Sequence, residues 1–333
     1  MEHELQVISE HRYLLGIDLG GTGSRAALTP FAHTLPDASA LTEASTVRRL
    51  DGGRISVTAG GSTVIDVAEA LIGDARRAWP DARIAAVGVG AAGVASLVDD
   101  PDAAATRLAR AADAPAALAA DAVTANLGAL AGAPGAVVAV GTGAIALGTD
   151  LDRVWRRVGG WGHLYDDRGS GAWIGIRALQ AAIETHDGIR QDAVALLALA
   201  TERFGPVGAW PAHLYPRADR AGVLAGLAAD VARLADSGDA VATAILDEAG
   251  ARIAATLAAA LDPGLPRVAS FTGGVFASPV VDAAFRREFA RLAPDADLRA
   301  AAGTPLDGAL HLARRLATGA LPRDRPPYLW LAD

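Results

Sequence analysis

Short apolar runs that end at paired glycines recur along the chain. One run covers residues 13–19, stops at Gly20 and Gly21, and resumes over residues 24–28. Two apolar runs joined by a glycine-rich turn are typical of a β-hairpin. A second unit of the same kind lies between residues 136 and 148, around a Gly-Thr-Gly turn. The pattern therefore predicts two strand–turn–strand units in separate parts of the chain.

Between the two hairpins the pattern changes to a helix followed by a strand. Ser62 or Thr63 can cap a helix that continues to Trp79 and is stopped by Pro80. The apolar residues 83–89 then read as a buried strand that runs into further glycines. Hairpin, helix and strand together make one α/β domain.

The second half begins with a short apolar run over residues 117–121, and a helix is predicted from there to Leu130. Residues 191–261 read as helical and rich in alanine, with apolar side chains spaced along one helix face. That stripe consists of Ile245, Ala249, Ile253, Leu257 and Leu261. A last strand over residues 267–272 and a helix from about 305 to 316 complete the predicted elements.

The alternation of strands and helices in both halves predicts an α/β fold. A chain of 333 residues is longer than one core usually serves, which suggests two domains. We place them at residues 1–117 and 118–333. The second carries the helical insertion, and the last helix can pack back on the first domain.

The composition narrows the chemistry. The formal charge is −8 with no dense basic block, which argues against nucleic acid or an anionic membrane as a partner and favours a small ligand. There is no cysteine, which excludes disulfides, thiolate zinc sites, iron–sulfur clusters and cysteine nucleophiles. All 30 basic residues are arginines, which excludes a lysine-based phosphate loop and Schiff-base chemistry. The charged first residues do not resemble a signal peptide and no run reads as a membrane span, so we expect a cytoplasmic protein. A homodimer stays open.

The first glycine turn lies in GIDLGGTGSR, residues 16–25. Its backbone amides from Gly20 to Ser24 can form a concavity that holds phosphate, and the hydroxyls of Thr22 and Ser24 add donors. Asp18, at the end of the strand, could hold Mg²⁺ through water. An ordinary hairpin with a turn-capping aspartate explains the same residues.

The second glycine turn, in VGTGAIALG from Val140, allows the β- and γ-phosphates of a nucleotide to be clasped between two hairpins. Asp121 precedes it at a strand-to-helix junction and could orient a substrate hydroxyl; the alternative is a helix N-cap. In FTGGVFAS, Gly273 and Gly274 suit close approach by adenine and ribose, although a βα turn without ligand fits equally well.

The stretch GGWGHLYDDRGSGAWIG, residues 159–175, combines six glycines and two tryptophans with Asp166, Asp167 and Arg168. Glycines let a backbone approach a ligand, and tryptophans are costly to leave exposed, so the stretch reads as the wall of a pocket. A surface pair between Asp166 and Arg168 is the bland alternative.

In this order, the four motifs resemble the N-acetylglucosamine kinase and BadF-type ATPase family of the actin-like ATPase superfamily, from Gly16 to about Leu316. The resemblance implies two ribonuclease-H-like domains around a central cleft, with ATP clasped between the hairpins. It implies Asp121 as the catalytic aspartate, and Asp167 and the tryptophan loop as sugar contacts.

The resemblance assigns the site residues as follows. The nucleotide would contact Gly20, Gly21, Thr22, Gly23, Ser24, Arg25, Gly141, Thr142, Gly143, Gly273, Gly274 and Val275. The sugar would contact Trp161, Gly162, His163, Asp166, Asp167 and Ser62, and Asp18 would serve Mg²⁺.

Several positions depart from the family pattern. The family's Gly-Asp-Glu-Gly-Ser reads Asp166-Asp167-Arg168-Gly-Ser here, which changes the charge of the sugar pocket. Ala144 stands where serine is usual, and Ser62 lies in a segment where related sugar kinases often carry a sugar-binding asparagine.

The implied function is ATP-dependent phosphorylation of an amino sugar on its carbon-six hydroxyl. The added carboxylate of Asp166 favours glucosamine, whose amine is protonated, over N-acetylglucosamine, which is the alternative. The electron-transfer activators of BadF type need cysteine-ligated iron–sulfur clusters, which the absence of cysteine excludes. A sugar- and ATP-binding sensor without catalysis is a third interpretation, against which Asp18, Asp121 and both glycine turns argue.

Overall fold

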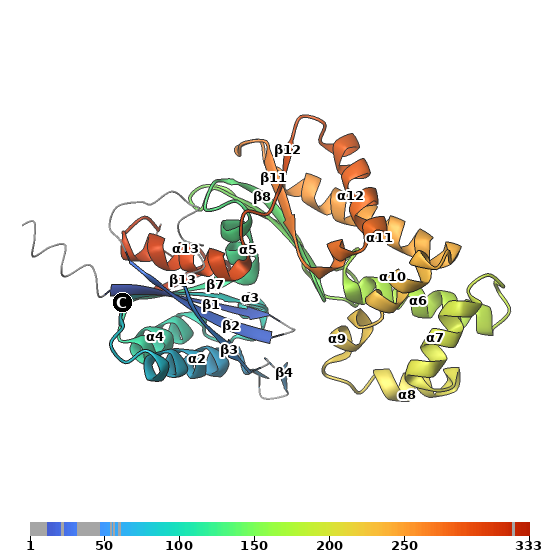
Figure 1. The fold of residues 1–333 in the computed structure, drawn as a ribbon, viewed down its shortest axis with the longest axis horizontal. Coiled ribbons are helices and arrows are strands. Elements are labelled where there is room, and N and C mark those ends of the chain that lie inside the picture. The colour runs from blue at the N-terminus through green and yellow to red at the C-terminus, as the bar shows by residue number, and fades with distance from the viewer. Residues whose placement is uncertain are drawn as a thin grey trace, which may run out of the picture.

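The computed structural model describes residues 12–20, 23–31, 47–53, 55, 57–58, 61–321 and 324–333. Two mixed β-sheets, each covered by helices, lie side by side in it, as the predicted α/β fold requires (Figure 1). Helix α7 (Val194–Phe204) lies at the end of the molecule furthest from the first sheet (Figure 1).

The first sheet has the strand order β13-β7-β6-β1-β2-β3. Its strands are β1 (Arg12–Gly20), β2 (Gly23–Pro30), β3 (Arg48–Gly52), β6 (Arg83–Ala91), β7 (Ala116–Ala120) and β13 (Leu329–Ala332). Strands β1, β6 and β7 are parallel, so their carboxyl ends lie at one edge of the sheet. The helices of this part of the chain are α2 (Val64–Ala78), α3 (Val94–Leu97) and α4 (Pro101–Ala112), and β4 (Val57–Thr58) and β5 (Gly61–Ser62) form a separate ribbon.

The second sheet has the order β10-β9-β8-β11-β12. Its strands are β8 (Gly135–Val140), β9 (Ala144–Thr149), β10 (Trp155–Gly159), β11 (Val268–Thr272) and β12 (Asp297–Ala300). The helices that follow β7 are α5 (Asp121–Ala129), α6 (Gly171–His186), α7 (Val194–Phe204), α8 (Trp210–Leu214), α9 (Arg220–Ala225), α10 (Ala228–Asp236), α11 (Ala240–Ala260), α12 (Pro279–Leu292) and α13 (Pro305–Ala317), with the 3₁₀ helices η2 (Val207–Ala209) and η3 (Gly274–Ala277).

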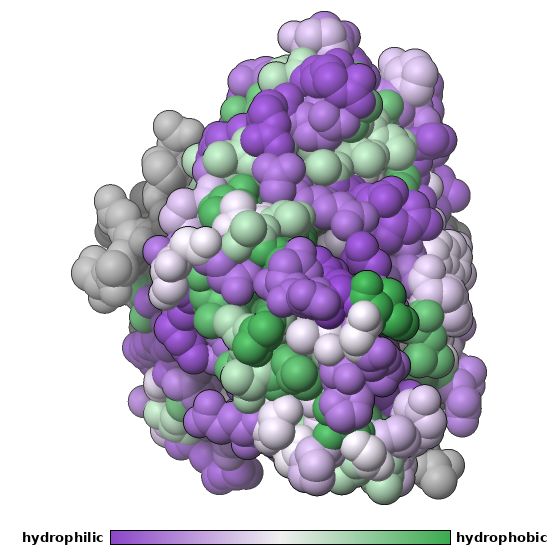
Figure 2. Space-filling view, turned by 90° about the vertical axis from the view of Figure 1, so that its right-hand side faces the viewer, coloured by the Kyte–Doolittle hydropathy of each residue, from purple (hydrophilic) through white to green (hydrophobic). Residues whose placement is uncertain are grey.

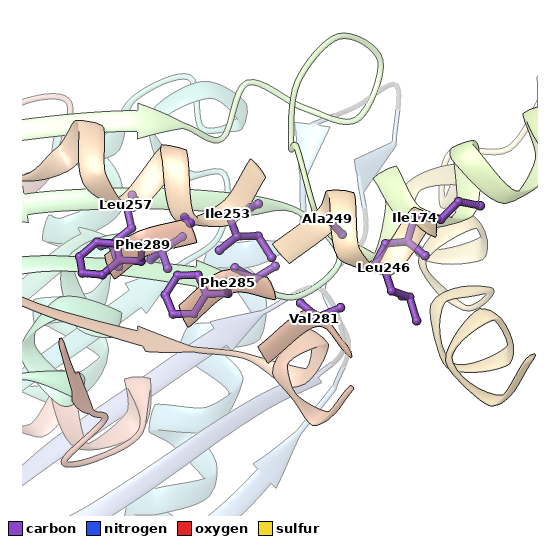
Figure 3. Packing of buried hydrophobic residues seen from close by; sticks show 14 of the residues in the cluster. Ile174, Leu246, Ala249, Ile253, Leu257, Val281, Phe285 and Phe289 are labelled. Carbon is purple, nitrogen blue, oxygen red and sulfur yellow. The ribbon is translucent and has the colours of Figure 1, made fainter. Parts of the chain in front are cut away.

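The predicted apolar stripe on the long helix forms the core of the second lobe. All five of its residues are buried: four lie on α11, and Leu261 directly follows its last residue. Figure 3 shows Ile253 and Leu257 of α11 beside Phe285 and Phe289 of α12, and Ala249 belongs to the same buried cluster. Polar and apolar groups are mixed on the surface over the helical end of this lobe (Figure 2).

Period-two alternation decides what each face of β1 meets. Leu15, Ile17 and Leu19 pack in the cluster shared with α2 and α4, whereas Leu14 packs against α13 on the other face. Gly16 lies on that same face, where an added Cβ would come within 2.9 Å of Leu310. The first residue of the glycine motif therefore has to be glycine so that α13 can pack closely on β1.

The strand over residues 267–272 was predicted to be the last, and this is wrong. β12 pairs in parallel with β11, and β13 pairs antiparallel with β7. Both are four-residue edge strands, whose pairing depends on a distant neighbour more than on a local pattern. β3 and β10 were likewise not assigned from the sequence.

Helices α5 and α13 cross at the junction of the two sheets, with backbone close to backbone (Figure 1). A Cβ on Gly308 of α13 would lie 1.8 Å from the carbonyl oxygen of Thr124, and one on Gly128 of α5 would lie 2.0 Å from that of Thr304. α13 covers the first sheet, and α5 covers the second, where the Asn126 side chain donates to the carbonyls of Gly135 and Leu147, both at 3.0 Å. The crossing therefore joins the two sheets.

We expect Gly308→Ala to lower the free energy of unfolding by about 1–3 kcal/mol, because the methyl group forces the two helices apart. The matched control is Gly222→Ala in α9, where no atom lies within 4 Å of the added Cβ. There alanine should be neutral or stabilise by roughly 0.5–1 kcal/mol. Urea unfolding followed by circular dichroism compares the two variants, and equal effects would contradict the tight crossing.

Candidate functional site

The described part of the first hairpin forms as predicted. Gly20 pairs with Gly23 at the ends of β1 and β2, and Asp18 is level with Arg25. Gly21 and Thr22, at the tip, lie outside the described residues. The Ser24 hydroxyl donates to the carbonyl of Gly53 at 2.5 Å, so it would have to give up this bond to serve phosphate.

Asp121 is the first residue of α5, directly after β7. The N-cap position belongs to Ala120, so the alternative of Asp121 as a helix N-cap does not hold. Its carboxylate accepts a hydrogen bond from the amide of Ala122 at 2.9 Å. Asp18 and Asp121 thus lie near the same edge of the first sheet, separated by β6, whose Gly90 carries no side chain between them.

Asp18 and Asp121 are close enough for their charges to interact. Burial, reinforced by the Asp121 charge and opposed by Arg25, raises the pKa of Asp18 to about 6. Burial also raises the pKa of Asp121, while the amide of Ala122 and the charge of Arg157 lower it. Two carboxyls held together this way resist full ionisation until a cation arrives.

The second glycine turn, Gly141 to Gly143, is docked on the start of α6. The amide of Gly141 donates to the carbonyl of Gly143 at 2.9 Å. The carbonyls of Gly141 and Thr142 accept from the amides of Gly171 at 2.9 Å and Ala172 at 3.1 Å. The turn is therefore held in one conformation by the first amides of a helix.

Gly273 lies between β11 and η3, and Gly274 is the first residue of η3. Gly273 has a φ of 118°, and an added Cβ would lie 2.0 Å from the carbonyl oxygen of Val140. Glycine is therefore required where this segment meets β8, whether or not a ligand binds there. Val275 follows and packs against the core of the second lobe.

Asp166 supports the tryptophan loop from inside. Its Oδ2 accepts a hydrogen bond from the amide of Trp161 at 3.1 Å, and its Oδ1 lies 3.2 Å from Nε of Arg168. Its side chain is only 6% exposed, whereas that of Arg168 is 60% exposed. The ion pair between Asp166 and Arg168, which was the alternative interpretation of this motif, therefore exists. It is not a pair of two exposed side chains, because Asp166 is buried under the loop.

Asp167 links the same loop to the second glycine turn. It has a φ of 54°, and its Oδ1 accepts from the amide of Gly162 at 3.4 Å. Its Oδ2 lies 2.9 Å from the point where a Cβ on Gly143 would be. Burial is the main cause of its raised pKa; the amides of Ala144 and Gly162 oppose the shift.

His163 lies near Asp167, and one nitrogen of its ring is free to bind a ligand. Its Nε2 is buried and has no hydrogen-bond partner among the described residues. Burial and the charge of Arg220 lower its pKa, while Asp167 raises it, and the net lowering favours the neutral ring. A neutral imidazole with a free nitrogen can donate to or accept from a polar ligand.

Arg157 on β10 is the site residue that the sequence analysis missed. Its charge acts on Asp121, and its guanidinium lies 4.0 Å from the centre of the Trp161 ring. In the sequence, Arg157 is only an arginine two residues before a pair of glycines. That pattern does not indicate a site until the pairing of β10 with β9 is known. Ser62, by contrast, accepts from the amide of Val64 at 3.3 Å, and no contact among the described residues ties it to the other groups.

The described residues contain no group of three or more histidine, aspartate or glutamate side chains that could cage a metal ion. Nor does any described helix have the length and apolar character needed to cross a membrane.

Comparison with known proteins places these residues in context. The BadF/BadG/BcrA/BcrD ATPase family matches the chain over residues 15–306. A Chromobacterium violaceum protein assigned as an N-acetylglucosamine kinase has a similar structure, with 28% identity, a TM-score of 0.66, and coverage of 91% of this chain and 99% of that one. A ROK family glucokinase from Streptomyces griseus shares the fold at 19% identity and a TM-score of 0.59, over 91% of this chain and 99% of its own.

A curated N-acetylmuramic acid/N-acetylglucosamine kinase from Clostridium acetobutylicum is 45% identical over 53 residues. The matched stretch spans 16% of this chain and 17% of that protein.

We expect Asp121→Asn to lower the pKa of Asp18 from about 6 toward its ordinary 3.8, because a neighbouring negative charge is removed. Folding raises this pKa, so ionising Asp18 costs stability as pH rises from 3.8 to 6, and the variant should lose less over that window. Carboxyl ¹³C NMR, with Asp18 assigned by Asp18→Asn, measures the midpoint. Asp51→Asn is the control, because Asp51 is exposed and pairs only loosely with Arg25 at 4.0 Å; an unchanged midpoint in Asp121→Asn would separate the two acids.

Proposed function

The chain belongs to the BadF/BadG/BcrA/BcrD ATPase family, and we propose that it is an ATP-dependent hexosamine kinase that phosphorylates an amino sugar. The finer proposal is conversion of glucosamine to glucosamine 6-phosphate. The observation that carries the kinase is the interacting pair Asp18 and Asp121, which lies at the carboxyl edge of the first sheet, next to the described part of the first glycine hairpin.

Asp121 is proposed to be the general base. Its carboxylate follows a buried strand and is fixed by the amide of Ala122, which keeps it pointing from a rigid helix start. Its raised pKa makes it a stronger base than an ordinary aspartate, and still leaves it able to take a proton from the carbon-six hydroxyl as that oxygen attacks the γ-phosphate. Orientation of the hydroxyl is the larger part of this role.

Asp18 is proposed to hold Mg²⁺. Magnesium in kinases keeps several waters and takes one or two carboxylates together with substrate phosphates, rather than a cage of protein ligands. One partly buried carboxylate with a raised pKa and a second acid nearby fit that donor set. When bound, the ion would neutralise phosphate charge as the phosphoryl group is transferred.

The two glycine turns are proposed to face the phosphates of ATP. The second turn is rigid because the start of α6 holds its carbonyls, so its remaining backbone groups can be preorganised for an anion. Arginine alone supplies side-chain cations in this chain, and Arg25 on the first hairpin is exposed enough to reach a ligand. Gly273 and Gly274 would accept the adenosine next to the second turn.

At the sugar end, Asp167 is the carboxylate proposed to meet the free amine. Asp166 has an arginine partner, Arg168, whereas the partners of Asp167 are the amides of Gly162 and Ala144, and its pKa is raised chiefly by burial. The pKa of the sugar's amine can be compared with that of an α-amino group, about 7.7–8.0, so the amine is largely protonated at neutral pH. Its positive charge would stabilise the ionised form of Asp167, which burial disfavours. His163 and the exposed Trp161 complete this side of the site.

N-acetylglucosamine is the second candidate substrate. Arg168 offsets the charge of Asp166, so the acid that replaces the family's glycine adds less negative potential than its sequence position suggests. The Chromobacterium violaceum and Clostridium acetobutylicum proteins described above carry N-acetylglucosamine in their names. Similarity to them supports the same substrate for this chain.

We expect Asp121→Asn to keep the fold and lower kcat by about 10²–10⁴, the range for removal of a general base. Coupled ADP release with the best sugar measures it. Asp113→Asn is the matched control, since Asp113 is exposed at the end of α4 and should leave kcat unchanged. A near-native kcat in Asp121→Asn would remove this residue from the mechanism.

We expect kcat/KM to favour glucosamine over N-acetylglucosamine, and Asp167→Asn to reduce that preference by about ten- to a hundredfold, the value of a charged hydrogen bond. Asp166→Asn should change it less, because Asp166 already serves the loop. The three proteins are compared across pH 6 to 9. A native preference for the acetylated sugar would establish the second candidate instead, and phosphorylation of neither sugar nor any other hexose would refute the kinase.

A further inference from the structure

A cavity of about 480 Å³ lies along β10, at the edge of the second sheet. Residues 153–157 line it together with Asp262 and Tyr328. Among the described strands β10 pairs only with β9, so the other side of its backbone has no strand partner and offers N–H groups to a ligand. Of the residues described above as the candidate site, only Arg157 lines this cavity.

Two arginines without a salt-bridge partner in the described part of the chain reach this cavity. Adjacent side chains alternate along a strand, so Arg156 and Arg157 lie on opposite faces of β10. Arg156 uses its Nε to donate to the carbonyl of Ala259, and Arg157 uses Nε and Nη2 to donate to the carbonyls of Gly159 and Gly160. Both Nη groups of Arg156 and the Nη1 group of Arg157 remain available as donors.

Trp155 and Tyr328 form an aromatic wall of the cavity. Their rings are stacked, with centroids 5.3 Å apart and an interplanar angle of 17°. Trp155 belongs to the second sheet, whereas Tyr328 directly precedes β13 of the first sheet. The Tyr328 carbonyl accepts a hydrogen bond from the amide of Ala120 at the end of β7, at 3.0 Å. A ligand that lies against this wall therefore contacts parts of the chain that belong to both sheets.

The lining indicates the chemistry of the ligand. Guanidinium groups that are not paired with an acid match the geometry and charge of a phosphate group. Asp262, whose Oδ1 accepts from the amide of Gly264 at 2.8 Å, would repel a bare anion but can accept a hydrogen bond from a hydroxyl or an amine. The volume falls within the range of small-molecule sites, roughly 300–1,000 Å³. These features together fit a phosphate group attached to a small polar body.

We propose that this cavity is a second ligand site, which binds a small phosphate ester of a sugar. The phosphate lies between Arg156 and Arg157 at the free edge of β10, and the hydroxyl or amine groups of the sugar face Asp262 and Tyr328. Arg153, whose side chain is 88% exposed, adds positive charge at the rim. The site is additional to the proposed ATP and sugar sites, and binding there does not require that the chain is a kinase.

Isothermal titration calorimetry with glucosamine 6-phosphate and with inorganic phosphate tests the proposal. Arg156→Met keeps an apolar stem but removes the guanidinium, so we expect the Kd for glucosamine 6-phosphate to rise at least about tenfold, the value of a charged hydrogen bond. Asp262→Asn should weaken the ester but not inorganic phosphate, for which it removes a like charge. Arg110→Met is the matched control, because Arg110 is an exposed arginine of α4 outside the cavity and should leave both Kd values unchanged.

Glucosamine 6-phosphate is also the product of the proposed reaction, so binding at the sugar site has to be told apart from binding at β10. Binding that Asp167→Asn changes and Arg156→Met does not would belong to the sugar site and would overturn this proposal. Thermal unfolding verifies that each variant folds.

If Arg156→Met does not fold, Arg153→Met takes its place, because an exposed side chain can be replaced without loss of the fold. Removal of this rim charge should raise the Kd by about threefold, and an unchanged Kd would overturn the site. The calorimetry needs no catalysis, so the kinase proposal and this site can fail independently.

Discussion

The contact in which α5 crosses α13 without intervening side chains is the constraint on which the site depends. Gly308 lies where any Cβ would meet the carbonyl of Thr124. α13 is seated on the first sheet at Gly16, and α5 is tied to the second through Asn126. The crossing thus sets the spacing of the two sheets. It also brings Asp121, at the start of α5 and the end of the first sheet, within reach of the second sheet.

The second constraint on the site is the negative charge of two acids that lie near each other. Asp18 and Asp121 are both buried enough to raise their pKa values, and the charge of Asp121 further opposes ionisation of Asp18. Arg25 and Arg157 act against this from two different lobes, but Arg25 is largely exposed and its field is weakened by water. The charge of Arg157 favours the ionised form of Asp121 against the effect of burial, which is the form that the proposed general base requires.

The sequence was sufficient for features that depend on local chemistry. The described parts of both glycine hairpins, the helix after Thr63 and the apolar stripe of α11 follow from turn residues and periodicity, and the structure confirms them. It was insufficient where pairing joins distant segments. The four residues of β13 become a strand only because β7 offers a free edge, and Arg157 becomes part of the site only because β10 lies beside β9, facing α5. The motif positions of Asp18 and Asp121 could be predicted, but not that their charges would interact.

The block Asp166-Asp167-Arg168 shows how position and role separate in a motif. Three adjacent charges look like one electrostatic unit in the sequence. The positive φ of Asp167 turns the chain between them, so that Asp166 is directed to the amide of Trp161 and Asp167 to Gly162 and the second glycine turn. A buried acid that binds a loop amide and an arginine stabilises the conformation of the loop. It adds little negative potential to the pocket, because the arginine already compensates its charge. Asp167, which forms no ion pair among the described residues, is the carboxylate next to the second glycine turn. Under the proposed function, a preference for a charged sugar would therefore be created at Asp167, beside the turn that is proposed to face the phosphates.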